Sequence, residues 1–342
     1  MDFKKIFIKD ANPTKVGGQA VLDGIMMKGE DRTAVVVRSP KGRLYIKTEL
    51  LPERKSAAKI PIIRGVYIFV STLITGMKTL MYSAEVLEML YAEEENIEQT
   101  EEEEEGGIPF GVMIILSVVL AIAMVVGIFI IVPTIVVNFL EGLVPNAIAL
   151  NLIEGAFRIA LFVVYIIVIS KMKDIRTTFE YHGAEHKTIH CYENGLPLTP
   201  KNASEFETLH PRCGTSFLMF VMIIALLLFS LLGWPDLFAR ILSRIILIPV
   251  IAGLSFELLR FAGSNDSLLV KVLSVPGLLL QKLTTQNPDE QQLGVAIAAL
   301  SAVLVPADTP VIEGYCTEDG KLIPPENSLW ADSVLEGLDY AE

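Results

Sequence analysis

The stretch "IPFGVMIILSVVLAIAMVVGIFIIVPTIVVNF", residues 108–139, decides the class of fold because it contains no charged side chain. A transmembrane helix needs about 20 consecutive apolar residues to cross the hydrocarbon core of a bilayer. Hydrophobic residues make up 52% of the 342-residue chain, which is high for a soluble protein. The sequence therefore predicts an integral membrane protein, in which Pro133 marks a kink or the end of the first span.

Three further segments are apolar enough to cross a membrane: residues 147–170, 215–233 and 241–262. The connection between the last two, "GWPDLFAR", is short and is typical of a tight helical hairpin. We therefore expect four transmembrane helices, arranged as one hairpin over residues 108–170 and a second hairpin over residues 215–262.

Another apolar run is too short for a complete span. It extends from Gly65 to Met77 and is followed by Lys78, so it has 13 uncharged residues where about 20 are needed. Residues 60–92 are therefore predicted to form an interfacial or re-entrant helix, with a fifth span as the alternative.

Charge is segregated along the chain and predicts the orientation. Residues 1–64 carry 14 Lys and Arg against 7 Asp and Glu, and the loop at 171–214 opens with the cationic "KMKDIR", whereas the loop around "EGLVPN" has no cation. By the positive-inside rule, we expect a multi-pass protein of the cytoplasmic membrane with both termini in the cytoplasm. No basic motif with interleaved aromatic residues supports nucleic acid as a partner. The expected partner is the lipid bilayer.

The remaining segments complete a mainly α-helical fold class. Residues 1–59 are predicted to form a small β-containing cytoplasmic unit, since "TAVVVRS" and "RLYIKTEL" flank a turn at Gly42. Residues 263–305 are expected to be a cytoplasmic segment with a helix capped by Asn287. We expect the acidic linker at 93–107 and the acidic tail at 306–342 to be solvated.

All four histidines of the chain lie between positions 182 and 210, inside the expected cytoplasmic loop. The segment "HGAEH" has the H-x-x-E-H pattern of inverted zincins. On a helix, His182 and His186 share a face and can direct two imidazoles at one ion. Glu185 lies about 60° from the position of His182 and could act as a general base without being a ligand.

A catalytic zinc site usually has three protein ligands, and "HPRCGT" offers His210 or Cys213 as the third. The expected cofactor is a divalent metal ion, with zinc in first place. His190 continues the helical stripe as a reserve ligand, whereas Cys191 projects from the opposite side. Four ligands together would indicate a closed structural site, and ordinary surface histidines near lipid headgroups are the remaining alternative.

Other polar residues are accessory candidates. Gln19 and Asp23, in a glycine-rich segment, could face a cytoplasmic site, and Glu257 and Arg260 lie at the end of the last span, where charges are functional candidates or a self-paired set. The charges in the second span, Glu154 and its i+4 neighbour arginine, are expected to form a structural pair.

Three motifs in this order, "VGGQAVLDGIMMKG", "YHGAEHKTIHCYENG" and "HPRCGTSFL", resemble the YqhQ-like family of bacterial membrane proteins over residues 15 to 300. That resemblance implies a membrane protein of unknown function with the label of a predicted metal-dependent enzyme. The positions that it singles out are Gly17, Gly18, Gln19, His182, Glu185, His186, His210, Cys213 and Gly214.

The expected function is therefore a membrane-bound, metal-dependent enzyme, with a hydrolase favoured and a membrane-associated substrate. The alternative is a non-enzymatic membrane scaffold or partner-binding protein with a structural metal site. Transport has little support because the central parts of the first and third spans lack polar residues.

Overall fold

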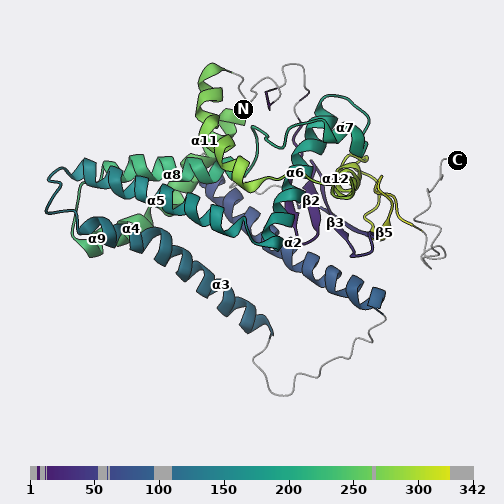
Figure 1. Ribbon diagram of the computed structural model, residues 1–342, viewed down its shortest axis with the longest axis horizontal. Coiled ribbons are helices and arrows are strands. Elements are labelled where there is room, and N and C mark those ends of the chain that lie inside the picture. The colour runs from purple at the N-terminus through teal and green to yellow at the C-terminus, as the bar shows by residue number, and fades with distance from the viewer. Residues whose placement is uncertain are drawn as a thin grey trace.

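The computed structural model describes residues 6–7, 12, 14–52, 60, 62–95, 110–263 and 267–323. Over these residues the chain is mainly helical and contains a small antiparallel sheet. The sheet and its covering helices lie at one end of an elongated molecule, and a bundle of apolar helices extends away from it (Figure 1).

The sheet has five strands in the order β1-β2-β3-β4-β5, and each neighbouring pair is antiparallel. The predicted hairpin is confirmed, with Gly42 in its turn at a φ of +91°. The last strand comes from the segment expected to be an acidic tail, and its Cys316 pairs with Leu44. The strands are β1 (Gly17–Val21), β2 (Gly24–Lys28), β3 (Arg32–Arg38), β4 (Leu44–Leu50) and β5 (Glu313–Cys316).

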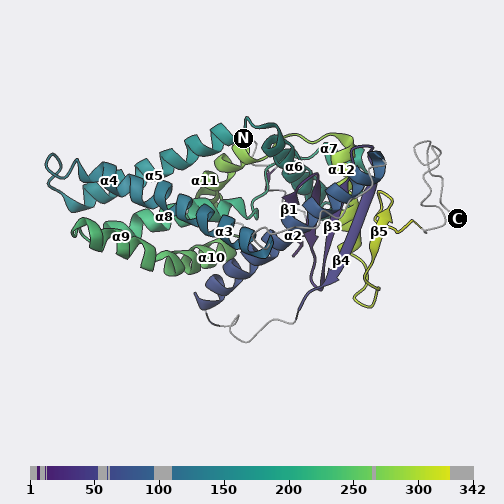
Figure 2. The ribbon, with the colours of Figure 1, turned by 90° about the horizontal axis from the view of Figure 1, so that it is seen from below.

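Helices cover both faces of the sheet because successive side chains of a strand point to opposite faces. Ile25 and Met27 pack in a core that includes residues of α6 (Lys173–Glu193) and α12 (Glu290–Val303). Met26, between them, belongs to a second core with Val86 and Leu90 of α2 (Ile63–Glu95). Figure 2 shows α6 and α12 on one side of the strands and α2 on the other.

Helix α2 (Ile63–Glu95) joins the sheet to the helix bundle as one continuous helix of 33 residues. The sequence predicted an interfacial or re-entrant helix over nearly the same residues. At its start, α2 packs against α10 (Ile248–Gly263), where a Cβ on Gly65 would lie 2.9 Å from the Cα of Gly253. The first glutamates of the expected acidic linker belong to this helix, and residues 96–109 lie outside the described residues.

The apolar bundle contains fewer clear spans than the four expected. Residues 115–138 and 147–169 are long and apolar enough to cross a membrane, and a third crossing is present if two helices bent by 44° count as one. The bend follows from Pro249, which lacks the N–H for a helical hydrogen bond. The bundle helices are α3 (Phe110–Val126), η2 (a π-helical turn, Gly127–Ile131), α4 (Val132–Asn138), α5 (Ala147–Ile169), α8 (Thr215–Ser230), α9 (Leu237–Ile246) and α10.

Two helices beyond the bundle differ from the prediction for residues 263–305. Helix α11 (Leu268–Thr284) was not expected, and it packs closely on α8, since a Cβ on Gly277 would lie 2.4 Å from the Ser216 Oγ. Helix α12 is capped by Asp289, not by Asn287. The Asp289 carboxylate accepts from the Gln292 N–H in a capping box.

Candidate metal centre

The expected histidine helix is α6, and it places two imidazoles side by side. His182 and His186 are four residues apart on one face, and their ring centroids lie 4.5 Å apart. The loop that follows α6 returns through α7 (Pro200–Ser204) and brings Cys213 to the same place, at the start of α8.

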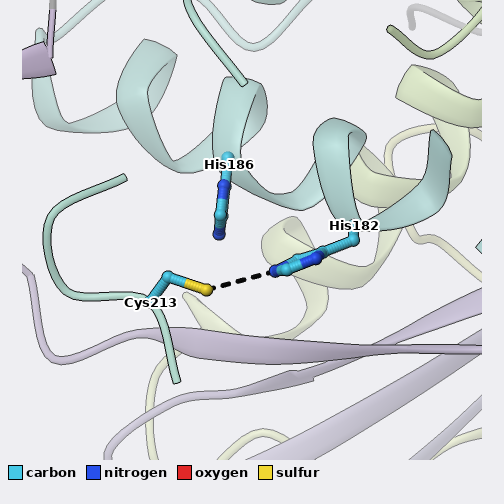
Figure 3. Close-up of side chains that lie close together, drawn as sticks. All are labelled: His182, His186 and Cys213. Carbon is cyan, nitrogen blue, oxygen red and sulfur yellow. Dashed lines mark hydrogen bonds between the residues drawn. The ribbon is translucent and has the colours of Figure 1, made fainter. Parts of the chain in front are cut away.

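One ligand atom from each of His182, His186 and Cys213 lies within 4.8 Å of the other two. The Cys213 Sγ is 3.2 Å from the His182 Nε2 (Figure 3). His186 and Cys213 are buried, and His182 is partly buried. The structure therefore brings together three of the residues that the sequence predicted, from segments about 30 positions apart.

Backbone carbonyls orient both imidazoles. The Nδ1 of His182 lies 2.8 Å from the Thr284 carbonyl oxygen, and the Nδ1 of His186 lies at hydrogen-bond distance from the Thr208 carbonyl oxygen. A carbonyl only accepts, so both Nδ1 atoms carry the proton, and the Nε2 atoms present lone pairs. The Nε2 of His186 is buried and has no hydrogen-bond partner among the described residues.

This donor set fits a divalent metal ion. A histidine that ligates a metal normally donates its other ring N–H to a carbonyl or carboxylate, as both imidazoles do here. Two imidazole nitrogens and a thiolate suit Zn²⁺ better than Mg²⁺ or Ca²⁺, which prefer oxygen. The Nε2 of His186 is a buried acceptor without a donor, and such an atom needs a partner, which a metal ion would supply.

His210 lies next to this group, but its ring atoms are engaged elsewhere. Its Nδ1 accepts from the Arg212 N–H at 3.3 Å, and its Nε2 faces the Glu193 carboxylate at 3.7 Å. His190 is directed at the Leu209 carbonyl at 3.0 Å. Neither residue is among the three converging donors.

Burial and nearby charges determine the ionisation states of His190, His210 and Glu193. Burial lowers the pKa of His190 and of His210 to about 4, so both are neutral at pH 7. Burial would raise the pKa of Glu193, but hydrogen bonds from His210 and from the Thr14 backbone, with the charge of Arg212, lower it to about 2. Glu193 is therefore an anion that fastens the N-terminal segment and the 210–213 turn to α6.

Glu185 is buried beside the group and contacts the first strand. Its Oε1 accepts the Gly18 N–H at 2.8 Å, and burial raises its pKa. A Cβ on Gly18 would lie 2.9 Å from the Glu185 Cδ, which explains why a glycine occupies this position of β1. The "GGQ" motif and the histidine motif, 167 positions apart, thus meet at this hydrogen bond.

The accessory candidates lie away from the three donors. Gln19 donates to the Gly76 carbonyl of α2, and Asp23 occupies the β1–β2 turn with a φ of +43°. Glu257 pairs with Arg64 of α2 and forms no ion pair with Arg260 in the described structure.

One thiol and one amine in the same region, those of Cys191 and Lys187, have structural contacts. Cys191 is buried in the core beneath α6, on the opposite side of the helix from the donors, as expected. Lys187 donates to the carbonyls of Ser204 and Phe206 and so ties the loop to α6.

Sequence reasoning did not find the groups that orient the imidazoles. The carbonyls of Thr208 and Thr284 carry no sequence signal, because any residue supplies a carbonyl. One signal was present in Gly183, which weakens a helix interior and therefore indicates close packing. A Cβ there would lie 2.0 Å from the Gln286 carbonyl oxygen, so the glycine lets the end of α11 approach α6.

Comparisons with known proteins identify a family but assign no activity. Residues 60–305 match the family model described as "Protein of unknown function (DUF1385)". The chain is 33% identical over 296 residues to a Bacillus subtilis (strain 168) protein described as "Uncharacterized protein YqhQ". The alignment covers 85% of this chain and 93% of that protein. No solved structure matches. The chain therefore belongs to the YqhQ-like, DUF1385 family of proteins of unknown function.

Proposed function

We propose that this protein is a multi-pass membrane protein that holds a divalent metal ion, zinc in first place, with His182, His186 and Cys213. The observation that carries this proposal is the unpaired Nε2 of His186, buried beside the His182 Nε2 and the Cys213 Sγ. Both imidazoles are already in the tautomer that a metal requires.

Membrane placement is supported by the apolar surface of the bundle. Ile115, Leu116 and Val168 are 65%, 60% and 59% exposed, and such side chains form wide patches that suit lipid rather than water. We place four crossings at α3–α4, α5, α8 and α9–α10. Helix α8 spans roughly 24 Å at 1.5 Å per residue, so residues 231–233 complete its crossing.

The distribution of cations supports the orientation. The segment that opens α6 is basic, and the connection between α4 and α5 has no Lys or Arg. The sheet, α6 and the three donors then lie on the cytoplasmic side of the cytoplasmic membrane, with both termini. A cytoplasmic site also favours the thiol form of Cys213, which is free.

A catalytic role is favoured over a structural one by the number of ligands. Structural zinc sites are closed by four protein ligands, whereas catalytic sites have three and leave one position for substrate or water. The group formed by the described residues has three members, because His210 is held by Glu193 and by the Arg212 N–H.

The reaction class that fits this arrangement is hydrolysis. A bound divalent metal supplies a Lewis acid and lowers the pKa of water. Glu185, adjacent to a ligand on the same helix, is the general base, and the Gly18 N–H fixes the position of its carboxylate. His182 and His186 are held by carbonyls, so the ligand set needs little reorganisation when the ion binds.

The space that we propose for a substrate is a cavity of about 520 Å³ between β1 and α2, which is connected to the candidate metal centre through Gly18 and not through the three donors. Its lining includes Gly18, whose N–H contacts Glu185, and also Thr72 and Thr75 of α2. Since α2 joins the sheet to the apolar bundle, the cavity favours a membrane-associated substrate. Its lining also contains Lys28 and the ion pair of Lys15 with Glu30.

Cobalt(II) binding to the full-length protein in detergent tests the ligand set. After removal of native metal with a chelator, we expect a sulfur-to-cobalt charge-transfer absorption in the wild type and its loss in Cys213→Ser. Cys191→Ser is the matched control, because Cys191 is also buried but lies in the core beneath α6. Absence of the band in the wild type, or its persistence in Cys213→Ser, contradicts the proposal.

Glu185→Gln distinguishes catalysis from a structural metal site. The amide can still accept from the Gly18 N–H, so the fold is retained. Loss of cellular function with the cobalt spectrum unchanged supports the enzyme. Full function in Glu185→Gln, with loss only in ligand variants, supports the alternative of a scaffold or partner-binding protein.

A further inference from the structure

A second buried polar group lies at the end of the bundle opposite the sheet, where α4, α5 and α9 meet (Figure 2). Its charged members are Glu154, Arg158, Arg240 and Arg244, and none is more than 8% exposed. We call these four residues the arginine cluster. Charges inside an apolar bundle are costly and therefore require an explanation.

The only carboxylate of the cluster is fully engaged. Glu154 accepts from the Thr134 hydroxyl at 3.1 Å, from the Arg158 Nη2 at 2.7 Å and from the Arg244 Nη2 at 3.2 Å. Arginine does not lose its proton in proteins. Within these four residues the guanidinium groups outnumber the carboxylate by two, and outside them Glu141 and Asp236 also attract Arg240 electrostatically.

Neutral acceptors satisfy some of the remaining donors without cancelling this charge. Arg158 donates to the Phe129 carbonyl in the π-helical turn η2. Arg244 donates to the Asn151 side chain at 2.6 Å, and Arg240 donates to the Asn138 side chain at 2.7 Å.

Three buried guanidinium nitrogens have no acceptor in the described structure: Nε and Nη1 of Arg240 and Nη1 of Arg244. Arg240 stacks over Trp234 at 3.7 Å, which covers its face but pairs none of its edges. Asp236, whose Oδ1 caps α9 by accepting from the N–H groups of Phe238 and Ala239, attracts Arg240 electrostatically but accepts no hydrogen bond from it in the described structure.

We propose that the arginine cluster binds a phosphate-type oxyanion through Arg240 and Arg244. Such an anion supplies both missing components, namely negative charge and several acceptor oxygens, and guanidinium groups are well suited to phosphate. The same chemistry is present in free phosphate and in the phosphodiester of a phospholipid headgroup. This site is separate from the candidate metal centre, and it does not depend on the proposed hydrolysis.

The test measures the unfolding temperature of the full-length protein in two arms, because a ligand that binds only the folded state raises it saturably. In the first arm, delipidated protein in detergent is titrated with inorganic phosphate. In the second arm, it is placed in nanodiscs of phosphatidylglycerol or of an uncharged, phosphate-free glycolipid. A rise in the first arm identifies free phosphate as the ligand, and a rise only with phosphatidylglycerol identifies the headgroup.

Two variants assign the effect to the cluster. In Arg240→Gln the loss of a charge-assisted contact should weaken binding about tenfold or more. Asn138→Asp places a carboxylate beside Arg240 with almost no change in shape, so it should weaken binding while keeping the fold. Arg176→Gln, at a solvent-exposed pair on α6, is the control and should respond like the wild type. No rise in either arm, or the same rise in Asn138→Asp and Arg240→Gln as in the wild type, overturns the proposal.

Discussion

The candidate metal centre and the arginine cluster, the two buried polar groups of this protein, lack opposite kinds of hydrogen-bond partner. At the candidate metal centre, donors from the imidazoles are all paired with backbone carbonyls, and the atom without a partner is an acceptor, the Nε2 of His186. In the arginine cluster the acceptors are all used, and the atoms without partners are donors of Arg240 and Arg244. We therefore propose a cation as the missing partner of the first group and an anion as that of the second.

The difference follows from the backbone around each group. The loop between α7 and α8 and the end of α11 have carbonyls outside regular hydrogen bonding, and these orient the imidazoles. In the bundle, helices satisfy most of their own carbonyls, so the arginines depend on side chains and on the carbonyl of Phe129 at the π-helical turn. In this protein, free carbonyls in a loop and at a helix end thus orient the imidazoles, whereas mainly side chains pair with the arginines.

The largest expected effect is the loss of the carboxylate of the arginine cluster. Glu154→Gln leaves Arg158 and Arg244 without their counter-ion, and removing one partner of a buried ion pair costs about 3–5 kcal/mol. We expect a large drop in the unfolding temperature in detergent. An unfolding temperature equal to that of the wild type would mean that Glu154 is not the charge that holds the cluster together.

A smaller effect is expected where α11 approaches the metal centre. Gly183→Ala puts a Cβ against the Gln286 carbonyl, and overpacking of this kind costs about 1–3 kcal/mol. It should also weaken metal binding, because the His182 Nδ1 bonds to the Thr284 carbonyl at the end of α11. Gly142→Ala, between α4 and α5, is the control, since nothing lies within 4 Å of its added Cβ. Equal zinc affinity in the two variants would contradict the role of α11.

The stability of the protein should depend on pH because of the buried histidines beside the candidate metal centre. Burial lowers the pKa of His190 from 6.5 to about 4, so below pH 6.5 the unfolded chain takes up a proton that the folded chain does not. The free energy of unfolding should therefore fall from pH 6.5 down to 4, by about 1.4 kcal/mol per pH unit for each such histidine. His190→Gln should reduce this slope, as measured by unfolding in the presence of a chelator. An unchanged slope would show that His190 does not contribute.

The smallest expected effect is at the pair between α2 and α10. Arg64 and Glu257 are partly exposed, at 19% and 26%, so water already weakens their attraction. Glu257→Gln should lower the free energy of unfolding by about 1 kcal/mol or less. A loss as large as that of Glu154→Gln would mean that exposure does not explain the difference between the two carboxylates.

Local patterns predicted the elements that depend on neighbouring residues. Runs of β-branched residues on either side of a turn at Gly42 indicated the β3–β4 hairpin, and the i, i+4 spacing of His182 and His186 indicated their shared face. The pair of Glu154 and Arg158 was found for the same reason. These features involve positions close in the sequence, where helix and strand geometry decide which side chains meet.

Features that depend on distant segments were not predicted. The pairing of Cys316 with Leu44 and the contact of Arg244 with Glu154 join positions that no local pattern relates. His210 was a candidate ligand because it lies near Cys213 in the sequence. Its engagement by Glu193 depends on where α6 ends, and the sequence does not indicate this.

The most direct test of the central claim is the metal content of the full-length protein purified in detergent and supplied with zinc. We predict about one zinc per chain for the wild type and for the control His190→Gln, whose ring faces a carbonyl outside the three donors. We predict no bound zinc for the His182→Ala, His186→Ala double variant. A wild-type protein that takes up no metal, or a double variant that keeps the full content, would contradict the account.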